Sequence, residues 1–313
     1  MFSNITHGTK MIFTKFRNCH TQFRKKPRLG SRFLTDLNKI YQFNAWDNVE
    51  WDENQELEAK RKVELNGVIK LSKDDIAKHE NEADKFWDSF YSVHSNRFFK
   101  DRHWLMTEFP ELGDTDEGLD KVFFELGCGV GNTVFPILRY SKGKKLLMHC
   151  CDFSETAINI LKENPEYDPS RCNPFVFDAT EEKWEMPFEE NSVDVVIMIF
   201  VLSAIKPEKF GNIIKEIYRY LKPGGLVLFR DYGRYDLAQL RFKQGRCIGD
   251  NFYVRGDGTM VYFFDAGEIK SMFENEGFEE VQNHVDRRLQ VNRGKFMKMY
   301  RIWIQGKYRK KIN

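Results

Sequence analysis

The sequence lacks a long apolar run, and it lacks cysteines at CxxC spacing. Its longest apolar stretch, residues 193–205, is interrupted by Asp194 and stopped by Lys206, whereas a membrane-spanning helix needs roughly 20 apolar residues. None of the six cysteines forms a CxxC pair or has a His partner at metal-ligand spacing. We therefore expect no membrane contact, no metal site and no disulfide framework, and we interpret the cysteines as reduced thiols, mostly core filler.

Acidic residues are absent from the first 35 positions. Ile12, Phe16, Cys19 and Phe23 occur there at helical spacing. An acid-poor, basic, amphipathic segment is typical of a mitochondrial presequence, so residues 1–28 are predicted to be a leader and the protein to be mitochondrial. A disordered basic tail that touches RNA phosphate, in a cytoplasmic protein, is the alternative. The basic residues of this segment are Lys10, Lys15, Arg17, Arg24, Lys25, Lys26, Arg28 and Arg32.

The far end of the chain has the same charge asymmetry, which the net charge of +2 conceals. No acidic residue follows Asp286, although Arg287, Arg288 and Arg293 and seven further Lys or Arg residues do. Clustered positive charge favours a polyanionic partner such as nucleic acid, and an ordinary solvated face would have the same composition.

The length of 313 residues allows one large domain and a substantial extension. Residues 45–71 have weak helical periodicity and predict an accessory helix. Residues 74–91 predict a second helix, whose end carries the aromatic residues Phe86, Trp87, Phe90 and Tyr91. The predicted divisions are the leader, a helical N-terminal region (29–112), an acidic linker that contains glycine (113–120) and a catalytic domain (121–313).

From residue 121 onward, short apolar strands alternate with helical patterns, which predicts a doubly wound α/β domain with a mostly parallel sheet. A helix at 266–276 and two β-like runs at 279–285 and 297–308 suggest a closing antiparallel hairpin. One reversed strand at the edge is the class I methyltransferase variant of this fold. The predicted strands are 122–126, 146–151, 174–177, 193–199 and 226–230, and the helices between them are 133–140, 154–164 and 209–221.

A glycine loop follows the first strand of this domain. The run from Glu125 through Gly127, Gly129 and Gly131 has the spacing ExGxGxG and precedes a helix. The dinucleotide fingerprint of dehydrogenases requires Gly or Ala where this chain has Asn132, and it places no acidic residue at Glu125. The loop therefore suits an adenosyl amino acid, S-adenosylmethionine, which has no pyrophosphate.

Three further residues end neighbouring strands, where ligands bind in open α/β sheets. Asp152 ends the second strand and is predicted to accept hydrogen bonds from both ribose hydroxyls. Asp178 ends the third and would accept one from the adenine amino group, while Ile199 ends the fourth and would supply an apolar wall. Together with Gly127 and Gly129 they form the predicted cofactor site.

Arginine and tyrosine alternate after the fifth strand. Unpaired bases stack on aromatic rings beside cations that hold phosphates, so these residues are candidates for RNA binding. A rim of solvated arginines and half-buried tyrosines is the alternative. The candidates are Arg230, Tyr232, Arg234, Tyr235, Tyr253 and Arg255, together with Arg287, Arg288 and Arg293.

Long strings of the sequence, covering nearly everything from residue 29 onward, resemble the tRNA N3-methylcytidine methyltransferases. They include GCGVGNTVFP from Gly127, RDYGRYD from Arg230, NAWDNVEW from Asn44 and FFKDRHWL from Phe98. The resemblance implies N3 methylation of cytidine 32 in the anticodon loop of a subset of tRNAs, with threonine tRNA typical of the most similar subgroup. It also implies that Trp87 and Tyr91 close over the methyl donor. Besides tRNA, a selecting partner such as an aminoacyl-tRNA synthetase is a candidate.

Methylation of cytosine N3 needs no strong general base, because N3 has a free lone pair once the base leaves its stack. Methylation leaves positive charge on the base, which a carboxylate would stabilise, and Asp231 is the candidate. An ion pair of Asp231 with Arg230 or Arg234 is the structural alternative. A small-molecule methyltransferase and a non-catalytic RNA-binding protein with this fold are the competing functions.

Overall fold

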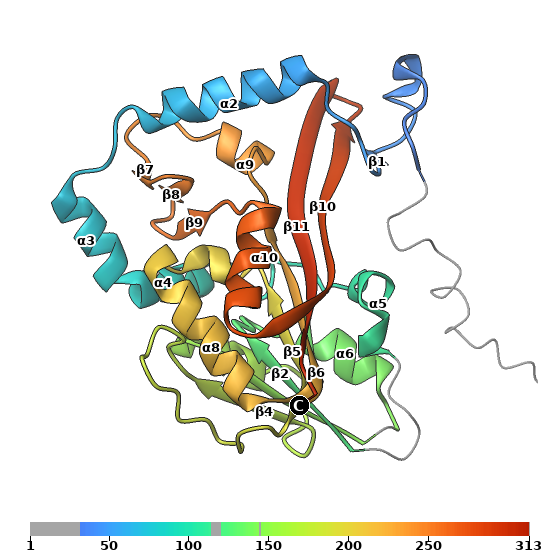
Figure 1. Cartoon of the computed structure of the whole chain (residues 1–313), viewed down its shortest axis with the longest axis vertical. Helices are drawn as coiled ribbons and strands as arrows, with labels where there is room; N and C mark the ends of the chain where they lie inside the picture. Colours follow the sequence, from blue (N-terminus) through green and yellow to red (C-terminus); the bar gives the residue numbers. More distant parts are fainter. Residues whose placement is uncertain (1–31, 114–119, 144, 313) are drawn as a thin grey trace, which may run out of the picture.

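The computed structural model describes residues 32–113, 120–143 and 145–312, so the predicted leader and residues 114–119 of the predicted linker lie outside the described residues. An eight-stranded sheet forms the centre of the molecule (Figure 1). In spatial order its strands are β1 (Ala45–Trp46), β10 (Phe278–Asn292), β11 (Met297–Lys310), β6 (Leu221–Tyr232), β5 (Val193–Ile199), β2 (Lys121–Leu126), β3 (Leu146–Asp152) and β4 (Cys172–Val176).

The predicted fold class is confirmed by the pairing of these strands. β6, β5, β2, β3 and β4 run parallel to one another, and β11 pairs antiparallel with β6. The reversed strand β11 lies between β6 and β10, so the edge beyond it is covered by β10 and the short β1. The chain order reverses at β2, between β3 and β5, which is where this kind of sheet binds ligands.

Helices cover both faces of the sheet because successive residues of the buried strands point to opposite sides. On one face, α8 (Phe210–Tyr220) and α10 (Ala266–Asn275) pack against a cluster that contains Phe124 and Val196. On the other, α6 (Val134–Tyr140) and α7 (Glu155–Lys162) pack against Phe123 and Ile197. The predicted helices of this domain are confirmed with their ends shifted by a few residues.

The N-terminal region differs from its prediction. Residues 45–71 form β1 and the shorter helix α2 (Glu53–Gly67), which begins at a capping box of Asp52 and Gln55. Residues 74–91 form two helices instead of one, because α3 (Lys73–Asn81) and α4 (Ala83–His94) are separated at Glu82. The other short elements of this region are η1 (Leu37–Lys39), α5 (Leu105–Glu108) and η2 (Pro110–Leu112).

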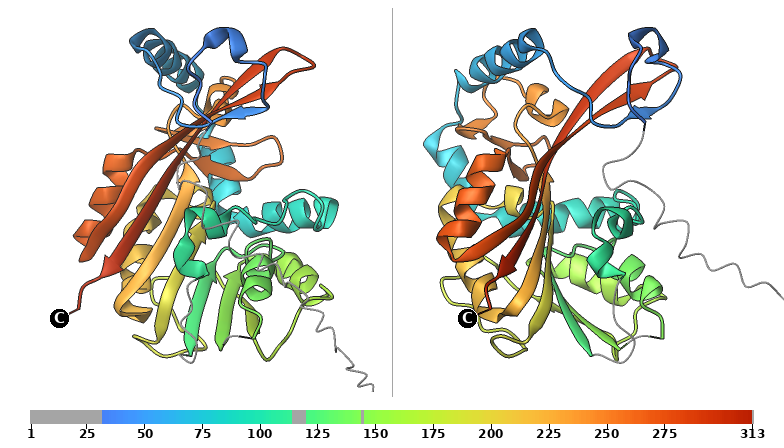
Figure 2. Two further views of the ribbon diagram at one scale, coloured as in Figure 1. Left: turned by 90° about the vertical axis from the view of Figure 1, so that its right-hand side faces the viewer. Right: turned by 45° about the vertical axis from the view of Figure 1, so that its right-hand side comes forward.

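β1 joins this region to the main sheet by pairing with β10. Trp46 packs with Ile40 against Leu289 and Val291 of β10. The long hairpin of β10 and β11 extends beyond the parallel strands to reach this segment, as Figure 2 shows. Both strands of this hairpin are longer than the sequence predicted.

A small sheet beside α2 was not predicted. It consists of β7 (Cys247–Gly249), β8 (Phe252–Val254) and β9 (Met260–Tyr262), and α9 (Leu237–Leu240) precedes it. Strands of three residues are too short to show an alternating pattern, so sequence periodicity cannot find them. Two further 3-10 turns, η3 (Leu202–Ala204) and η4 (Pro207–Lys209), follow β5. In the described part of the chain, no helix has the length and apolarity to cross a membrane.

Candidate functional site

A cavity of about 560 Å³ opens at the carboxyl ends of the parallel strands. Its walls come from the ends of β2 and β3, from the segments after β4 and β5, and from Met260 of β9. α3 and α4 close it on the remaining side with residues that include Trp87 and Tyr91. The cavity therefore lies at the carboxyl ends of the parallel strands, as the sequence predicted, and next to β2, where the strand order reverses.

The glycine loop leaves no room for side chains at two positions. Gly129 lies against α4, which we call the lid helix because it covers the cavity, and Gly127 lies against Val201. Gly129 has a φ of +52°, and a Cβ there would lie 2.6 Å from the hydroxyl oxygen of Tyr91. Gly127 has a φ of +68°, and its Cβ would lie 2.3 Å from Cγ2 of Val201. Both positions need the left-handed conformation that glycine adopts at little cost. Gly127 lines the cavity, whereas Gly129 is buried beneath Tyr91.

Asp152 lines the cavity and is fixed by two backbone hydrogen bonds. Its Oδ2 accepts from the N–H of Gly129 at 2.8 Å, and its Oδ1 accepts from the N–H of Ser154 at 3.0 Å. Burial outweighs these hydrogen bonds and raises the pKa of the Asp152 carboxyl to about 6. This carboxylate is ionised at neutral pH and faces the cavity, as a ribose acceptor must.

The other two strand-end predictions have different outcomes. Asp178 follows β4 by two residues, lines the cavity and accepts a hydrogen bond from the N–H of Thr180 at 2.8 Å. The prediction that Ile199 forms an apolar wall of the cofactor site is wrong. Its side chain is 1% exposed and packs in the core on the α6 side of the sheet. Phe200 and Val201, the next two residues, line the cavity instead.

A buried contact between a carboxyl group and a guanidinium lies behind the glycine loop. Oε1 of Glu125 is 3.9 Å from Nη1 of Arg102, and Arg102 donates to the hydroxyl of Thr133 at 2.7 Å. Burial raises the pKa of Glu125 to about 8, although Arg102 opposes the shift. Sequence reasoning gave Arg102 no role. Its only signal was its place in the Phe98 string, which resembles the family, so nothing local revealed the partner 23 residues away.

Asp231, the predicted charge-stabilising residue, lies at the end of β6 and is fully buried. It accepts hydrogen bonds from the backbone N–H groups of Ser203 at 2.9 Å and Tyr232 at 2.8 Å. Burial raises its pKa to about 6. The alternative, an ion pair with Arg230 or Arg234, is wrong, because those arginines pair with Asp286 and Glu268. Its catalytic role stays a prediction.

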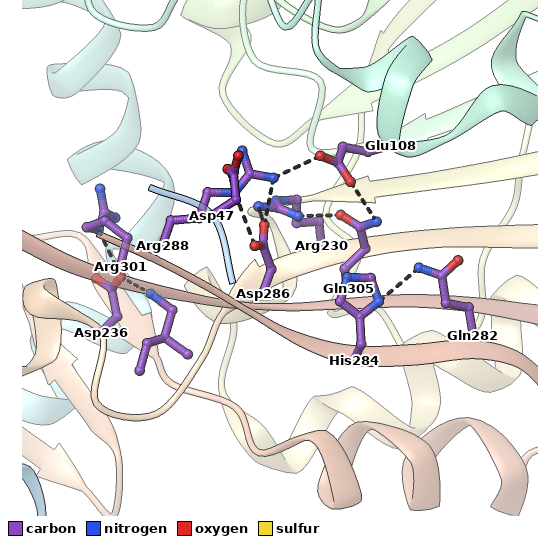
Figure 3. A network of polar contacts seen from close by, with 11 residues as sticks. Asp47, Glu108, Arg230, Asp236, Gln282, His284, Asp286, Arg288, Arg301 and Gln305 are labelled. Atoms are coloured by element: carbon purple, nitrogen blue, oxygen red, sulfur yellow. Dashed lines mark hydrogen bonds and ion pairs between the residues drawn. The ribbon is translucent and has the colours of Figure 1, made fainter. Parts of the chain in front are cut away.

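Arg230 belongs to a buried network that joins β6, β10 and β11 to the N-terminal region (Figure 3). It is 3% exposed, pairs with Asp286 at 2.5 Å and lies between the rings of Trp104 and Trp303. The prediction that Arg230 holds RNA phosphate is therefore wrong.

Arg288 and Tyr253 have different outcomes. Arg288 pairs with Glu108 at 2.8 Å, Asp286 at 3.0 Å and Asp47 at 3.8 Å, but its side chain is 25% exposed, so its phosphate contact stays a prediction. Tyr253 is 1% exposed and stacks on Phe242 at 4.6 Å, so it cannot stack on a base.

The remaining predicted RNA contacts stay accessible. Arg255 lies over the ring of Tyr232 at 5.5 Å, and that ring packs on cavity-lining Phe200. Tyr235 and Arg234 are half-buried near them. On the hairpin, Arg287 pairs loosely with Glu56 at 3.5 Å and Arg293 is exposed in the turn. The structure thus separates a group beside the cavity from a second group along the hairpin.

The residues of the cavity fit S-adenosylmethionine. Its volume lies in the range of small-molecule sites, and its lining supplies the carboxylates of Asp152 and Asp178 beside aromatic side chains. Asp152 would hold the ribose, Asp178 the adenine amino group, and Trp87 and Tyr91 would cover the cofactor. When bound, this cofactor supplies a methyl group already activated on a sulfonium. Among the described residues, no cluster of His, Cys, Asp or Glu could hold a metal.

Comparisons with known proteins agree with the fold. Residues 124–227 match a family model described as a methyltransferase domain. The PH0226 protein of Pyrococcus horikoshii is 20% identical with a TM-score of 0.52, over 71% of this chain and 99% of that one. A putative methyltransferase of Haloferax volcanii, solved with the Trm112 activator, has a TM-score of 0.50 at 15% identity, over 72% of this chain and 98% of that one.

The fold and the cavity define a class I methyltransferase that uses S-adenosylmethionine. The tRNA N(3)-methylcytidine methyltransferase Mettl2 of Drosophila melanogaster is 57% identical over 94% of this chain and 92% of its own length. The tRNA N(3)-cytidine methyltransferases of Danio rerio and Homo sapiens are 50% and 43% identical, each over 92% of this chain and over 90% and 95% of their own lengths. The chain belongs to the tRNA N(3)-cytidine methyltransferase family.

Proposed function

We propose that this protein methylates N3 of cytidine 32 in the anticodon loop of a subset of tRNAs, with threonine tRNA among them. The observation that carries the proposal is the 57% identity, over 94% of the chain, to a relative named for N3-methylcytidine in tRNA. The intact cofactor cavity supports catalysis over a purely RNA-binding role. Position 32 and threonine tRNA follow from the sequence resemblance.

The residues beside the cavity support a mechanism based on positioning. Cytosine N3 has a free lone pair when the base is unstacked, so in-line attack needs no strong base. Asp231, with a pKa raised to about 6 by burial, is ionised at neutral pH. It lies next to Tyr232, whose ring contacts cavity-lining Phe200. A buried carboxylate at this place stabilises the positive charge that methylation creates on the base.

The accessible basic and aromatic residues support RNA as the substrate. Arg255 and Tyr232 stand beside the cavity, where a base would stack and its phosphate would pair. Arg293 and Lys295 are exposed at the turn of the hairpin, farther from the cavity. This division matches a substrate that extends well beyond the methylated base.

The test uses purified protein, S-adenosylmethionine and transcripts of threonine tRNA with either cytidine or uridine at position 32. We expect 3-methylcytidine in the digest of the first transcript alone, detected by nucleoside mass spectrometry. Methylation of both transcripts would contradict the position. A parallel reaction uses total tRNA isolated from cells. If 3-methylcytidine formed there only in tRNAs other than threonine tRNA, the threonine assignment would be wrong, but the N3 methylation of cytidine would stand.

Two further proposals concern the cell. The acid-free segment before Asp36 supports a mitochondrial location, and imaging of the full chain against a variant that lacks residues 1–28 tests it. Equal cytoplasmic distribution of both would contradict it. An aminoacyl-tRNA synthetase is the proposed selecting partner, and added synthetase should then increase the methylation rate on its own tRNA alone.

A further inference from the structure

The lid helix α4 presents two adjacent faces to two parts of the site. Trp87 and Tyr91 are four residues apart, so they share one face of the helix, and both line the cavity. Asp88 follows Trp87 and is turned by about 100° around the helix axis. Its side chain contacts α7 instead of the cavity.

Asp88 makes two hydrogen bonds to the beginning of α7. Its Oδ1 accepts from the hydroxyl of Ser154 at 2.5 Å and from the backbone N–H of Thr156 at 3.2 Å. Ser154 is the N-cap of α7, and its Oγ also accepts from the N–H of Ala157 at 3.1 Å. The lid helix therefore binds the beginning of α7 through a carboxylate that comes from outside that helix.

The same serine is bonded to the predicted ribose acceptor. The N–H of Ser154 donates to Oδ1 of Asp152 at 3.0 Å, while its hydroxyl donates to Asp88. Asp88, Ser154 and Asp152 thus form a continuous chain of hydrogen bonds from the lid to the floor of the cavity. A displacement of α4 would have to break a link of this chain.

Apolar packing alone does not set the position of the lid. Phe90 and Tyr91 pack against Val130 of the glycine loop and Ala157 of α7. Such contacts are not directional, so they tolerate sliding and rotation of α4. The two hydrogen bonds of Asp88 are directional and charge-assisted, and they fix the register of α4 on α7.

We propose that Asp88 is a positioning residue for the cofactor, which holds α4 against Ser154 so that Trp87 and Tyr91 stand over the cavity. Asp88 does not line the cavity and acts through its neighbours. This inference concerns cofactor binding only, so it holds whichever RNA is methylated, and its test needs no RNA.

The test compares three variants by calorimetric titration with S-adenosylmethionine. Asp88→Ala removes the oxygen that accepts both hydrogen bonds and should weaken cofactor binding about tenfold, as expected for lost hydrogen bonds to a charged group. Asp88→Asn keeps a carbonyl oxygen for the same two donors and should stay within about threefold of wild type. Lys85→Ala is the matched control on α4 and should leave the Kd unchanged, because the exposed side chain of Lys85 pairs with Glu82 at 3.3 Å and with no other carboxylate in the described part of the chain.

A purely structural role of Asp88 as a cap of α7 gives a different pattern. It would lower the free energy of unfolding in Asp88→Ala but leave the cofactor Kd of the folded protein unchanged, and that result would overturn the proposal. If Asp88→Ala does not fold, Asp88→Glu replaces it in the titration. It keeps the charge but pushes α4 away by one methylene, so weaker cofactor binding is expected, and wild-type binding would again overturn the proposal.

Discussion

The carboxylate of Asp152 and the backbone of Gly129 are joined by a hydrogen bond of 2.8 Å. The glycine loop after β2 and the acidic end of β3 are therefore one unit, although 23 residues separate them in the chain. A Cβ at Gly129 would strike Tyr91 of the lid. The loop, the carboxylate and the lid can only be arranged together, which gives the cavity its defined shape.

Cofactor affinity should fall in mild acid. Asp152 must be ionised to accept from both ribose hydroxyls, and its pKa is raised to about 6. Affinity is therefore full above this value and is lost as the pH falls through it, by about tenfold between pH 7.5 and 5. Titration calorimetry with S-adenosylhomocysteine measures this. Asp152→Asn should bind more weakly and show a flat profile, and an equally steep profile in that variant would contradict the assignment.

The free energy of unfolding should fall as the pH rises, whereas cofactor affinity falls as the pH decreases, and Glu125 is the main cause. Its folded pKa is raised to about 8, so the folded state holds a proton that the unfolded chain releases near pH 4.5. The free energy of unfolding should fall as pH rises through this window, by at most about 1.4 kcal/mol per unit for one proton. Asp152 and Asp231 act in the same direction.

Glu125→Gln should remove the Glu125 part of this slope above pH 7, where Asp152 and Asp231, with pKa values of about 6, have largely titrated. Urea denaturation at several pH values between 7 and 8 measures it. An unchanged slope in the variant would mean that Glu125 is ionised throughout this range.

Arg230 should matter for folding. Replacement by Met leaves Asp286 with Arg288 as its remaining partner and opens the space between Trp104 and Trp303. Breaking a buried ion pair typically costs about 3 kcal/mol. Arg293→Ala, an exposed arginine, should change stability by less than about 0.5 kcal/mol. Equal stability of the two variants in urea would contradict the burial of Arg230.

Arg293 should instead contribute to RNA affinity. A lost phosphate contact lowers the slope of log affinity against log salt by about 0.7 to 0.9 for a nucleic-acid ligand. Fluorescence anisotropy with labelled tRNA, from 50 to 300 mM salt, should show this change for Arg293→Ala. Lys162→Ala, on α7, is the charge control and should keep the wild-type slope. A wild-type slope in Arg293→Ala would exclude a phosphate contact at the turn.

The sequence predicted the parallel strands because both faces of each are buried, which leaves short apolar runs separated by helices. Asp152 and Asp178 could be placed because the ends of parallel strands meet at one edge. Arg230 and Arg293 could not be distinguished, since the burial of Arg230 depends on Asp286 and Trp303, both distant in the chain. Ile199 failed for a local reason: the residue at the strand end faces the core, and the chain turns into the cavity one residue later.

The most direct test of the central claim is nucleoside mass spectrometry of tRNA incubated with S-adenosylmethionine and either wild-type protein or Asp152→Ala. We expect new 3-methylcytidine with the wild type and none above background with the variant, although both are folded. Equal 3-methylcytidine with both proteins would contradict the cofactor site. A different methylated nucleoside from the wild type would contradict the proposed reaction.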